Sequence, residues 1–332
     1  MNDDSAPVIS KQLAMATICG VTTMQVIATM GVLIPAAVAP EIARTLDLPV
    51  SMIGFQISLV YVGATTMSLA AGLVQRRLGA VRANQIAGFL VAASLLVIAL
   101  PHVATLVLGS LGLGVAYGLT NPSASHLMMK IASPENRNLI FSIKQTGQPM
   151  GGVVAGLLAP PIAVAFGWQW SLVCGACLAA LVLLSIQPLR SRLDGDRDPE
   201  TRFRGAVFRD VGLVFRLREL RLLAMAALTL SAVQMALVTF AVTMLVEDVR
   251  LDLVTAGVGL AVIQVAGVVG RLGWGAYADR FASPQKVLII TQVLSIIAAL
   301  VTTLLVPGMP LLVVFVILFL FGVSAVGWNG VF

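Results

Sequence analysis

The sequence predicts an all-α integral membrane protein that contains two related bundles of helices. Hydrophobic residues make up 58% of the 332 residues and charged residues only 11%, and the mean hydropathy is +0.98. Ten apolar stretches are each long enough to cross a bilayer core of about 30 Å as a helix. Short motifs also recur between the two ends of the chain at nearly constant spacing. Together these observations exclude a soluble globular domain.

The ten apolar stretches predict membrane-spanning helices rather than barrel strands. They are too long and too continuously apolar for strands that alternate between lipid and lumen. A helix also satisfies its own backbone hydrogen bonds in hydrocarbon. The predicted spans cover approximately residues 12–40, 50–74, 84–101, 103–130, 138–166, 169–188, 221–246, 253–278, 287–306 and 310–332.

Two pairs of motifs predict an internal duplication. The segments Gly72 to Gly79 and Gly275 to Ala282 each follow an apolar run and carry charge where that run ends. The segments Gly114 to Asn121 and Gly322 to Asn329 share Gly, Val and Asn at equal spacing, with an offset of 208 residues. Duplicated multi-helix halves are frequent in secondary transporters, which hold the substrate near mid-membrane between the repeats.

One long hydrophilic segment separates the two predicted halves. It contains nine arginines and six acidic residues between Arg190 and Arg221. Apolar and charged residues alternate at helical spacing from Phe208 to Leu220, which predicts a helix lying on the membrane surface. The predicted units are a six-helix half over residues 1–188, a cytoplasmic linker over 189–220 and a second half over 221–332.

The basic residues predict the orientation, because Lys and Arg in short loops stay on the cytoplasmic side. With the N-terminus inside, the opposite side carries only two basic residues, Arg44 and Arg250. The net charge of +6 therefore reflects topology, and we expect no nucleic-acid partner. The first apolar run is too long for a signal-peptide core. We predict a monomer that crosses the inner-membrane lipid bilayer many times and has a cytoplasmic N-terminus.

The loop motif of the second half resembles that of the major facilitator superfamily, which reads approximately G-x-x-x-D-R-x-G-R-K. Gly275, Asp279 and Arg280 fit this pattern, and Ala282 replaces the later glycine. In the family this loop latches the two halves in the outward-facing state through charge pairing. The resemblance implies that Asp279 has this gating role here.

The loop motif of the first half departs from the family pattern. Gly72, Arg77 and Gly79 fit it, but Arg76 stands where the family has Asp. The resemblance therefore implies a first-half latch without its acid.

The resemblance covers the whole chain and implies the family fold of two six-helix pseudo-repeats. That fold has twelve spans, whereas the sequence printed here stops within the equivalent of the tenth. Adding the 208-residue offset to the end of span 6 places the end of a complete chain near residue 396. We therefore expect a second pseudo-repeat that lacks its last two helices.

The sequence offers no pattern for metal, cofactor or enzymatic chemistry. Cys174 and Cys177 form a CxxC, but no His or second Cys pair lies near them to complete a zinc site. We find no nucleophile and base at facing positions. We therefore predict no metal, no cofactor and no enzyme.

Two cations lie deep inside predicted spans, where a charge costs about 2.5 to 3.5 kcal/mol on insertion scales. Ser133 and Pro134 predict a helix start that places Lys144 about 15 Å along the predicted span 138–166. Arg271 lies about 12 Å from the loop that follows the predicted span 253–278. No Asp or Glu lies deep in a predicted span, so neither cation has an evident buried partner.

Helical spacing places an amide and glycines beside each cation. An arginine can bind a carboxylate through two parallel hydrogen bonds, and a substrate anion is the simplest partner for an unpaired buried charge. The two faces contain Lys144 with Gln148 and Gly151, and Arg271 with Gln264, Gly267 and Gly275.

Other polar residues inside the predicted spans indicate a role less specifically. Gln25, Gln234 and Asn329 either line a cavity or bond across helices. Asn121 and its following proline, with His126 one turn on, favour a kink and helix packing over a proton relay.

The sequence thus predicts a secondary transporter that moves a small organic anion, in particular a carboxylate, by alternating access. Lys144, Arg271, Gln148 and Gln264 are the predicted substrate-binding residues. The chain is similar to bacterial monocarboxylate and oxalate/formate carriers, which implies a cation in the eighth predicted span, residues 253–278, as a substrate ligand. Alternatively, the cations reach headgroups or backbone carbonyls at broken helix ends. The other functions left open are a proton-coupled drug or neutral-solute permease and a membrane sensor or nonfunctional fragment without transport.

Overall fold

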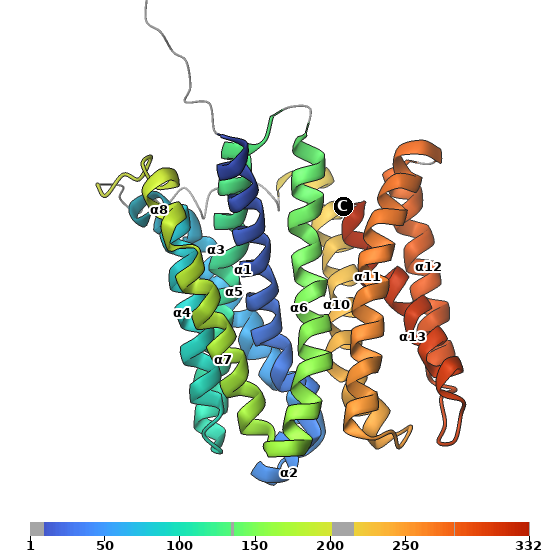
Figure 1. The fold of residues 1–332 in the computed structure, drawn as a ribbon. Helices are drawn as coiled ribbons and strands as arrows, with labels where there is room; N and C mark the ends of the chain where they lie inside the picture. The colour runs from blue at the N-terminus through green and yellow to red at the C-terminus, as the bar shows by residue number, and fades with distance from the viewer. Residues whose placement is uncertain (1–9, 134–135, 201–215, 282, 332) are drawn as a thin grey trace, which may run out of the picture.

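The computed structural model describes residues 10–133, 136–200, 216–281 and 283–331, and these residues form a bundle of helices (Figure 1). Ten of the described helical segments are long and apolar enough to cross a membrane, which confirms the predicted all-α membrane fold. The first group contains α1 (Lys11–Ala37), α2 (Ala39–Leu46), η1 (Val50–Met52), α3 (Ile53–Leu78), α4 (Ala80–Ile98), α5 (Val103–Ile131), α6 (Arg137–Phe166), α7 (Trp168–Ser185) and α8 (Gln187–Leu193). The second group contains α10 (Arg218–Glu247), α11 (Leu253–Phe281), α12 (Pro284–Thr302), α13 (Leu311–Ala325) and η2 (Gly327–Gly330).

Short helices mark the two ends of the bundle. The helix α8 lies at the upper end in Figure 1, and α2 lies at the lower end; we call these the α8 end and the α2 end. Neither short helix was predicted from the sequence. The last predicted span is also interrupted, because α13 ends at Ala325 and the η2 turn follows.

The predicted span over residues 138–166 agrees with α6, but the predicted helix cap at Ser133 is wrong. The helix α6 begins at Arg137 and has Asn136 at its N-cap. The Ser133 backbone N–H instead donates to Asn136 Oδ1 at 2.8 Å. Lys144 therefore lies about 10 Å from the start of α6, rather than about 15 Å. The predicted surface helix from Phe208 to Leu220 falls mostly on residues 201–215, which lie outside the described residues, and α10 begins at Arg218.

The two groups of helices meet mainly along α6 and α11, while α1 packs beside α10 (Figure 1). Glycines bring α6 and α11 close together. A side chain on Gly156 would overlap the backbone of Gly257, and a side chain on Gly257 would overlap that of Gly156. The backbones of the two groups therefore touch directly at this crossing.

The duplicated motifs have equivalent packing roles in the two groups. Gly114 of α5 lies against the backbone of Val60 in α3, and Gly322 of α13 lies against the backbone of Ile263 in α11. Val60 and Ile263 differ by 203 residues, the same offset that separates Gly72 from Gly275. The repeat predicted from sequence thus corresponds to a repeated helix–helix contact.

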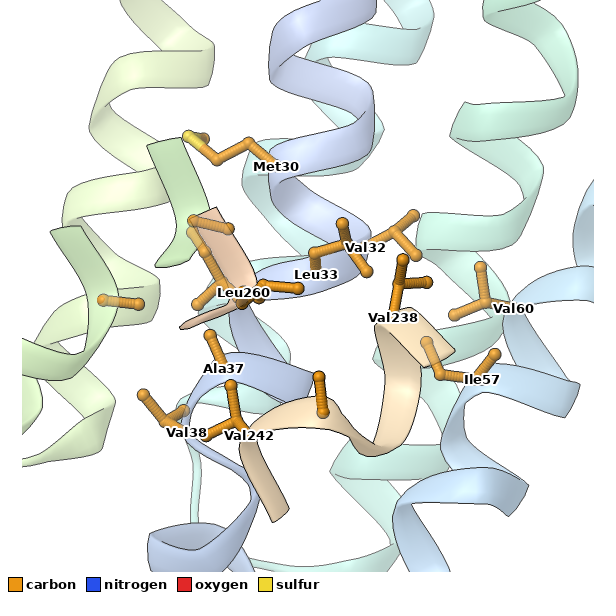
Figure 2. Close-up of a cluster of buried hydrophobic side chains, with 14 of the residues drawn as sticks. Met30, Val32, Leu33, Ala37, Val38, Ile57, Val60, Val238, Val242 and Leu260 are labelled. Carbon is orange, nitrogen blue, oxygen red and sulfur yellow. The ribbon is translucent and has the colours of Figure 1, made fainter. Parts of the chain in front are cut away.

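A cluster of buried apolar side chains joins the groups toward the α2 end (Figure 2). Ala37 of α1 lies beside Val242 of α10, and Val238 of α10 lies beside Ile57 and Val60 of α3. In a bilayer these contacts gain from close packing, since lipid is as apolar as the side chains themselves. The cluster closes the space between the groups at this end.

Candidate functional site

A small cavity of about 30 Å³ lies between the two groups, lined by α1, α3, α5 and α6 on one side and by α10 and α11 on the other. Leu33, Ile57 and Val238 of the apolar cluster form its wall toward the α2 end. The polar and aromatic lining includes Tyr61, Tyr117, Gln148, Gln234, Gln264 and Arg271.

Arg271 is 6% exposed. Two interruptions of regular helical structure hold its side chain in place. Its Nη1 donates to the carbonyl of Gln145. That carbonyl lacks its ordinary helical partner because Pro149, four residues later, has no N–H. Its Nε donates to the carbonyl of Val326 at 3.4 Å, just beyond the end of α13, where helix carbonyls are unsatisfied. The alternative that a cation binds carbonyls at broken helices is therefore observed for Arg271.

These two bonds leave donors for a ligand, since a guanidinium carries five N–H groups. Arg271 lines the cavity and forms no salt bridge with any residue that the structure describes. The backbone carbonyls hold the side chain without neutralising its charge. The result is a fixed, positively charged group at the wall of a largely apolar cavity.

The predicted amides accompany Arg271 in the cavity. Gln148 comes from α6 and Gln264 from α11, so the two amides approach from opposite groups. Gln264 lies against Gly152, where the contact leaves no room for a side chain. Amides offer both donors and acceptors, so this pair can orient a carboxylate or a hydroxyl beside the guanidinium.

Two tyrosines of the cavity were not predicted. Tyr61 of α3 and Tyr117 of α5 meet edge to face, with ring centroids 6.2 Å apart. Both rings line the cavity opposite the second group. No charge pattern marks these residues in the sequence, and only the contact between α3 and α5 brings them together.

Lys144 lies apart from Arg271 and does not line the cavity. Its side chain is 2% exposed, and its Nζ donates to Asn121 Oδ1 at 2.7 Å and to Ser125 Oγ at 2.8 Å. The Phe141 ring lies 5.7 Å from this nitrogen. Gln25 donates to the same Asn121 oxygen at 3.2 Å. The predicted pairing of both cations in one cavity is therefore not observed.

The glycines predicted beside the cations serve helix packing. Gly151 lies against Val26 and Met30 of α1, and Gly267 lies against Val326. Neighbouring helices thus fill the space that a ligand would need at these glycines.

An amide pair in the second group matches the one near Lys144. Gln234 Oε1 accepts from Asn329 Nδ2 at 3.0 Å and from Trp328 Nε1 at 2.9 Å. Gln25 and Gln234 are 209 residues apart, and Asn121 and Asn329 are 208 residues apart. Both groups therefore repeat a Gln–Asn contact, although only the first adds a lysine to it.

The first loop motif, Gly72 to Gly79, is contacted by an acidic residue from elsewhere in the chain. Asp194, which follows α8, is 5% exposed and accepts from the backbone N–H groups of Val81 at 2.8 Å and Arg82 at 3.0 Å. It therefore caps the first turn of α4, where negative charge is favourable. Gly79 has φ +95°, and any side chain there would overlap the Asp194 carboxylate.

Two further acidic residues that follow α8, Asp196 and Asp198, contact the ends of α5 and α3. The Asp198 backbone N–H donates to the Arg76 carbonyl at 2.8 Å. Asp196 bonds to His126 Nε2 at 3.0 Å and forms a salt bridge with Lys130. Burial would raise the pKa of Asp196, but its hydrogen bonds with Lys130 and His126 outweigh this effect and lower the pKa below its ordinary value. These contacts all lie within the first group, so they do not join the two groups.

The other predicted loop residues lie at helix ends. Gly72 faces open space, with no atom near the position of an added side chain. Arg77 is exposed at the end of α3, and Arg280 is exposed at the end of α11. Gly275 lies near the Gly330 carbonyl, which would be 3.1 Å from an added Cβ. The Asp279 side chain lies outside the described residues, so its latch role stays a prediction.

Comparison with known proteins matches this architecture to one family. A sequence model of the Major Facilitator Superfamily matches residues 21–332. The uncharacterized MFS-type transporter YhjX of Escherichia coli (strain K12) is 25% identical over 261 residues, which are 77% of this chain and 64% of that protein. An uncharacterized MFS-type transporter of Mycobacterium tuberculosis (strain H37Rv) is 25% identical over 291 residues, 86% of this chain and 63% of that protein. The chain therefore spans somewhat less than two thirds of the length of these relatives.

Solved structures share the fold at low identity. A bacterial homolog of the human lysosomal transporter Spinster, in an inward-facing conformation, has a TM-score of 0.72 at 16% identity, covering 97% of this chain and 74% of the other. The xylose transporter XylE of E. coli has a TM-score of 0.71 at 14% identity, covering 96% and 85%. The chain belongs to the major facilitator superfamily, a family of membrane transporters.

Proposed function

We propose that the protein is a secondary transporter that carries a small organic anion, in particular a carboxylate, by alternating access. Arg271 is the substrate-binding cation in this proposal, and Gln148 and Gln264 orient the bound anion. The protein acts as a monomer in the inner membrane, with its α8 end and its N-terminus in the cytoplasm.

The environment of Arg271 carries this proposal. The guanidinium is buried in the cavity wall and held by two neutral carbonyls. A buried charge without a counter-charge is costly, so an entering anion gains the attraction that the protein leaves unused. Fixed donors also lose little freedom when a carboxylate binds, which favours arginine over a mobile lysine.

The lining of the cavity favours a small solute. Its volume of about 30 Å³ lies well below the range of about 300 to 1,000 Å³ that small-molecule sites occupy, so in this proposal the cavity widens as the substrate enters. Its wall toward the α2 end is apolar, so the polar contacts concentrate on one side. This distribution suits a small carboxylate with a short apolar body.

The two ends of the bundle support an orientation. Basic residues gather at the α8 end, which favours a cytoplasmic location for that end. The apolar cluster of Figure 2 then closes the cavity toward the outside. In this proposal the structure represents the inward-facing state of the transport cycle.

The structural relatives do not decide the substrate. Their descriptions name xylose, peptides and a lysosomal transporter on the same architecture. A fold shared at such low identity supports several substrates. The choice of an anion therefore rests on Arg271 and not on these relatives.

Counterflow in proteoliposomes tests the proposal. Vesicles are loaded in turn with unlabelled formate, acetate, pyruvate, lactate, oxalate, xylose or a dipeptide, and entry of the same labelled compound is followed. We expect counterflow with at least one carboxylate and its loss in Arg271→Gln, whereas Arg250→Gln, on the loop before α11, retains it. Counterflow of xylose or the dipeptide that survives Arg271→Gln contradicts the anion proposal.

A further inference from the structure

A second polar cluster surrounds Lys144, outside the cavity. The buried amine bonds to Asn121 and Ser125 of α5, and both partners are neutral. No carboxylate among the described residues forms a salt bridge with it. Neither partner therefore carries a charge that would hold the proton on the nitrogen.

The cluster can satisfy the lysine in both protonation states. A hydroxyl both donates and accepts, whereas an ammonium only donates. The charged form of Lys144 donates to Asn121 Oδ1 and to Ser125 Oγ, as observed. The neutral amine still donates to Asn121 and accepts from the Ser125 hydroxyl, without any movement of heavy atoms. Buried polar groups that lose a partner are destabilised, and this arrangement avoids that loss.

The polar partners of Lys144 are less buried than the lysine itself, but the site has no room for a solute. Lys144 is 2% exposed and does not line the cavity. The next turn of α6 is also closed, because Gly147 packs against Thr22 and Gln25 of α1. Asn121 is nevertheless exposed, and Ser125 is half-buried. The Ser125 hydroxyl both donates and accepts, so a proton can reach the amine through it, whereas a carboxylate cannot approach the amine without moving a helix.

The helix α6 links this cluster directly to the cavity. Lys144 faces the first group, and the carbonyl of the next residue, Gln145, accepts from Arg271 of the second group. Gln148, one turn further along, lines the cavity. A change of charge at Lys144 therefore acts on the same turn of α6 that holds the substrate-binding guanidinium.

We propose that Lys144 is a proton-exchange site that couples movement of the anion at Arg271 to a proton gradient. This inference rests on the proposed function. One proton binds to Lys144 Nζ as the anion binds to Arg271, and that proton leaves the same nitrogen for water as the anion leaves. No other bond forms or breaks. By linkage, the anion raises the affinity for the proton by the same factor as the proton raises the affinity for the anion.

None of the neighbouring titratable groups described by the structure bonds to the Lys144 amine. These groups lie on the helices packed against α6 and surround the lysine at longer range. They are Lys11 and Cys19 on α1, Tyr117, His126 and Lys130 on α5, Cys174 and Cys177 on α7, and Arg271, Tyr277 and Arg280 on α11; Asp279 also belongs to α11, with its side chain outside the described part.

Two transport assays on the same proteoliposomes separate coupling from binding. Counterflow of the labelled carboxylate needs no net proton movement, whereas accumulation against its own gradient requires the imposed pH difference. We expect the wild type to accumulate the carboxylate several-fold. Lys144→Gln removes the exchangeable proton and Lys144→Arg retains a permanent charge. Both variants lose this accumulation but keep counterflow within about threefold. Lys130→Gln, the matched control at the α8 end, keeps both activities.

Three transport outcomes overturn the proposal. The first is accumulation by Lys144→Gln at the wild-type level. The second is loss of counterflow together with accumulation in both Lys144 variants, which identifies a substrate ligand or a structural residue. The third is a wild type that shows counterflow but never responds to a pH gradient. Elution of each variant as a monodisperse peak separates misfolding from these results, and Lys144→Met replaces a variant that fails this check.

A spectroscopic measurement tests the site even if no carboxylate is transported. The chain contains four lysines, so the 13Cε signals of lysine-labelled protein in nanodiscs are few, and the signal lost in Lys144→Gln is that of Lys144. We expect this signal to shift between about pH 5 and pH 9, below the range in which a solvated lysine titrates. A constant signal over that range overturns the proton-exchange site. A titrating signal without carboxylate counterflow instead contradicts the proposed substrate.

Discussion

The two groups of helices repeat the same polar contacts but place different residues beside them. In the first group Gln25 bonds to Asn121, whose oxygen also accepts from Lys144. In the second group Gln234 accepts from Asn329 and from Trp328. The amide pair is common to both repeats, whereas the charge is present only in the first.

A second comparison reverses this asymmetry. Ser68 of α3 donates to the Gly118 carbonyl at 3.2 Å, and Arg271 of α11 donates to the Val326 carbonyl at 3.4 Å. The two donors are 203 residues apart and the two acceptors 208, the offsets of the repeated motifs. Here the second group carries the charge, and the first has a hydroxyl. The duplicated scaffold thus supplies equivalent positions, and each repeat has placed its cation at a different one.

The largest expected effect separates Arg271 from its counterpart Ser68. Arg271→Gln removes the only cation among the described residues that line the cavity, and we expect the initial rate of carboxylate counterflow to fall about 100-fold, in line with the loss of a buried charged partner. Ser68→Ala removes one neutral bond at the equivalent position and should change the rate by less than about twofold. Equal losses in the two variants would show that both positions are structural.

The loop glycines give the second comparison. Gly79→Ala introduces the residue type that the second repeat carries at position 282. We expect it to destabilise the protein by about 3 kcal/mol, because it combines a backbone conformation open mainly to glycine with displacement of the Asp194 cap. Gly72→Ala in the same motif faces open space and should be neutral. Thermal unfolding in detergent measures both, and a stable Gly79→Ala protein contradicts the assigned role of Asp194.

The amide pairs give a third, smaller difference. Asn121→Ala removes the observed acceptor of Gln25 and one of the two acceptors of Lys144. We expect a loss of about 2 kcal/mol, the scale for buried polar groups left without a partner. Asn329→Ala leaves Gln234 bonded to Trp328 and should cost about 1 kcal/mol or less. Thermal unfolding of both variants decides the order, and a larger loss for Asn329→Ala would invert the comparison.

The smallest effect concerns Asp196, whose partners Lys130 and His126 belong to the first group. Because these partners lower its pKa in the folded protein, its stabilisation is present above the unfolded pKa of about 4 and is lost as pH falls through the folded pKa. The carboxylate is 45% exposed, so solvent screening limits its contribution to below about 1 kcal/mol. The gap in melting temperature between wild type and Asp196→Asn should therefore shrink below about pH 4. A constant gap contradicts the ionic role.

Sequence patterns predicted the spans because a long apolar run has few structural outcomes in a bilayer. The duplication was also visible, since close helix contacts at Gly114 and Gly322 require glycine in both repeats. The break after Ala325 and the short helix α8 were missed, because hydropathy alone does not register a local change of backbone direction within an apolar or interfacial segment.

The site was predicted only in part. Arg271, Gln148 and Gln264 do meet in the cavity, because their helices face each other in this fold. Helical spacing placed Lys144 with Gln148, but it did not reveal that the lysine turns toward Asn121 and Ser125, which share a face of α5. Asp194 caps a helix that begins more than a hundred residues earlier, and contacts of that kind depend on tertiary structure.

Pro149 has a consequence for how Arg271 is held. By freeing the Gln145 carbonyl, it creates the attachment point for Arg271, so a hydrogen bond joins α6 to α11 across the boundary. In this way a missing backbone hydrogen on one helix fixes a guanidinium that belongs to the other, while the remaining N–H groups of that guanidinium stay available for the proposed anion.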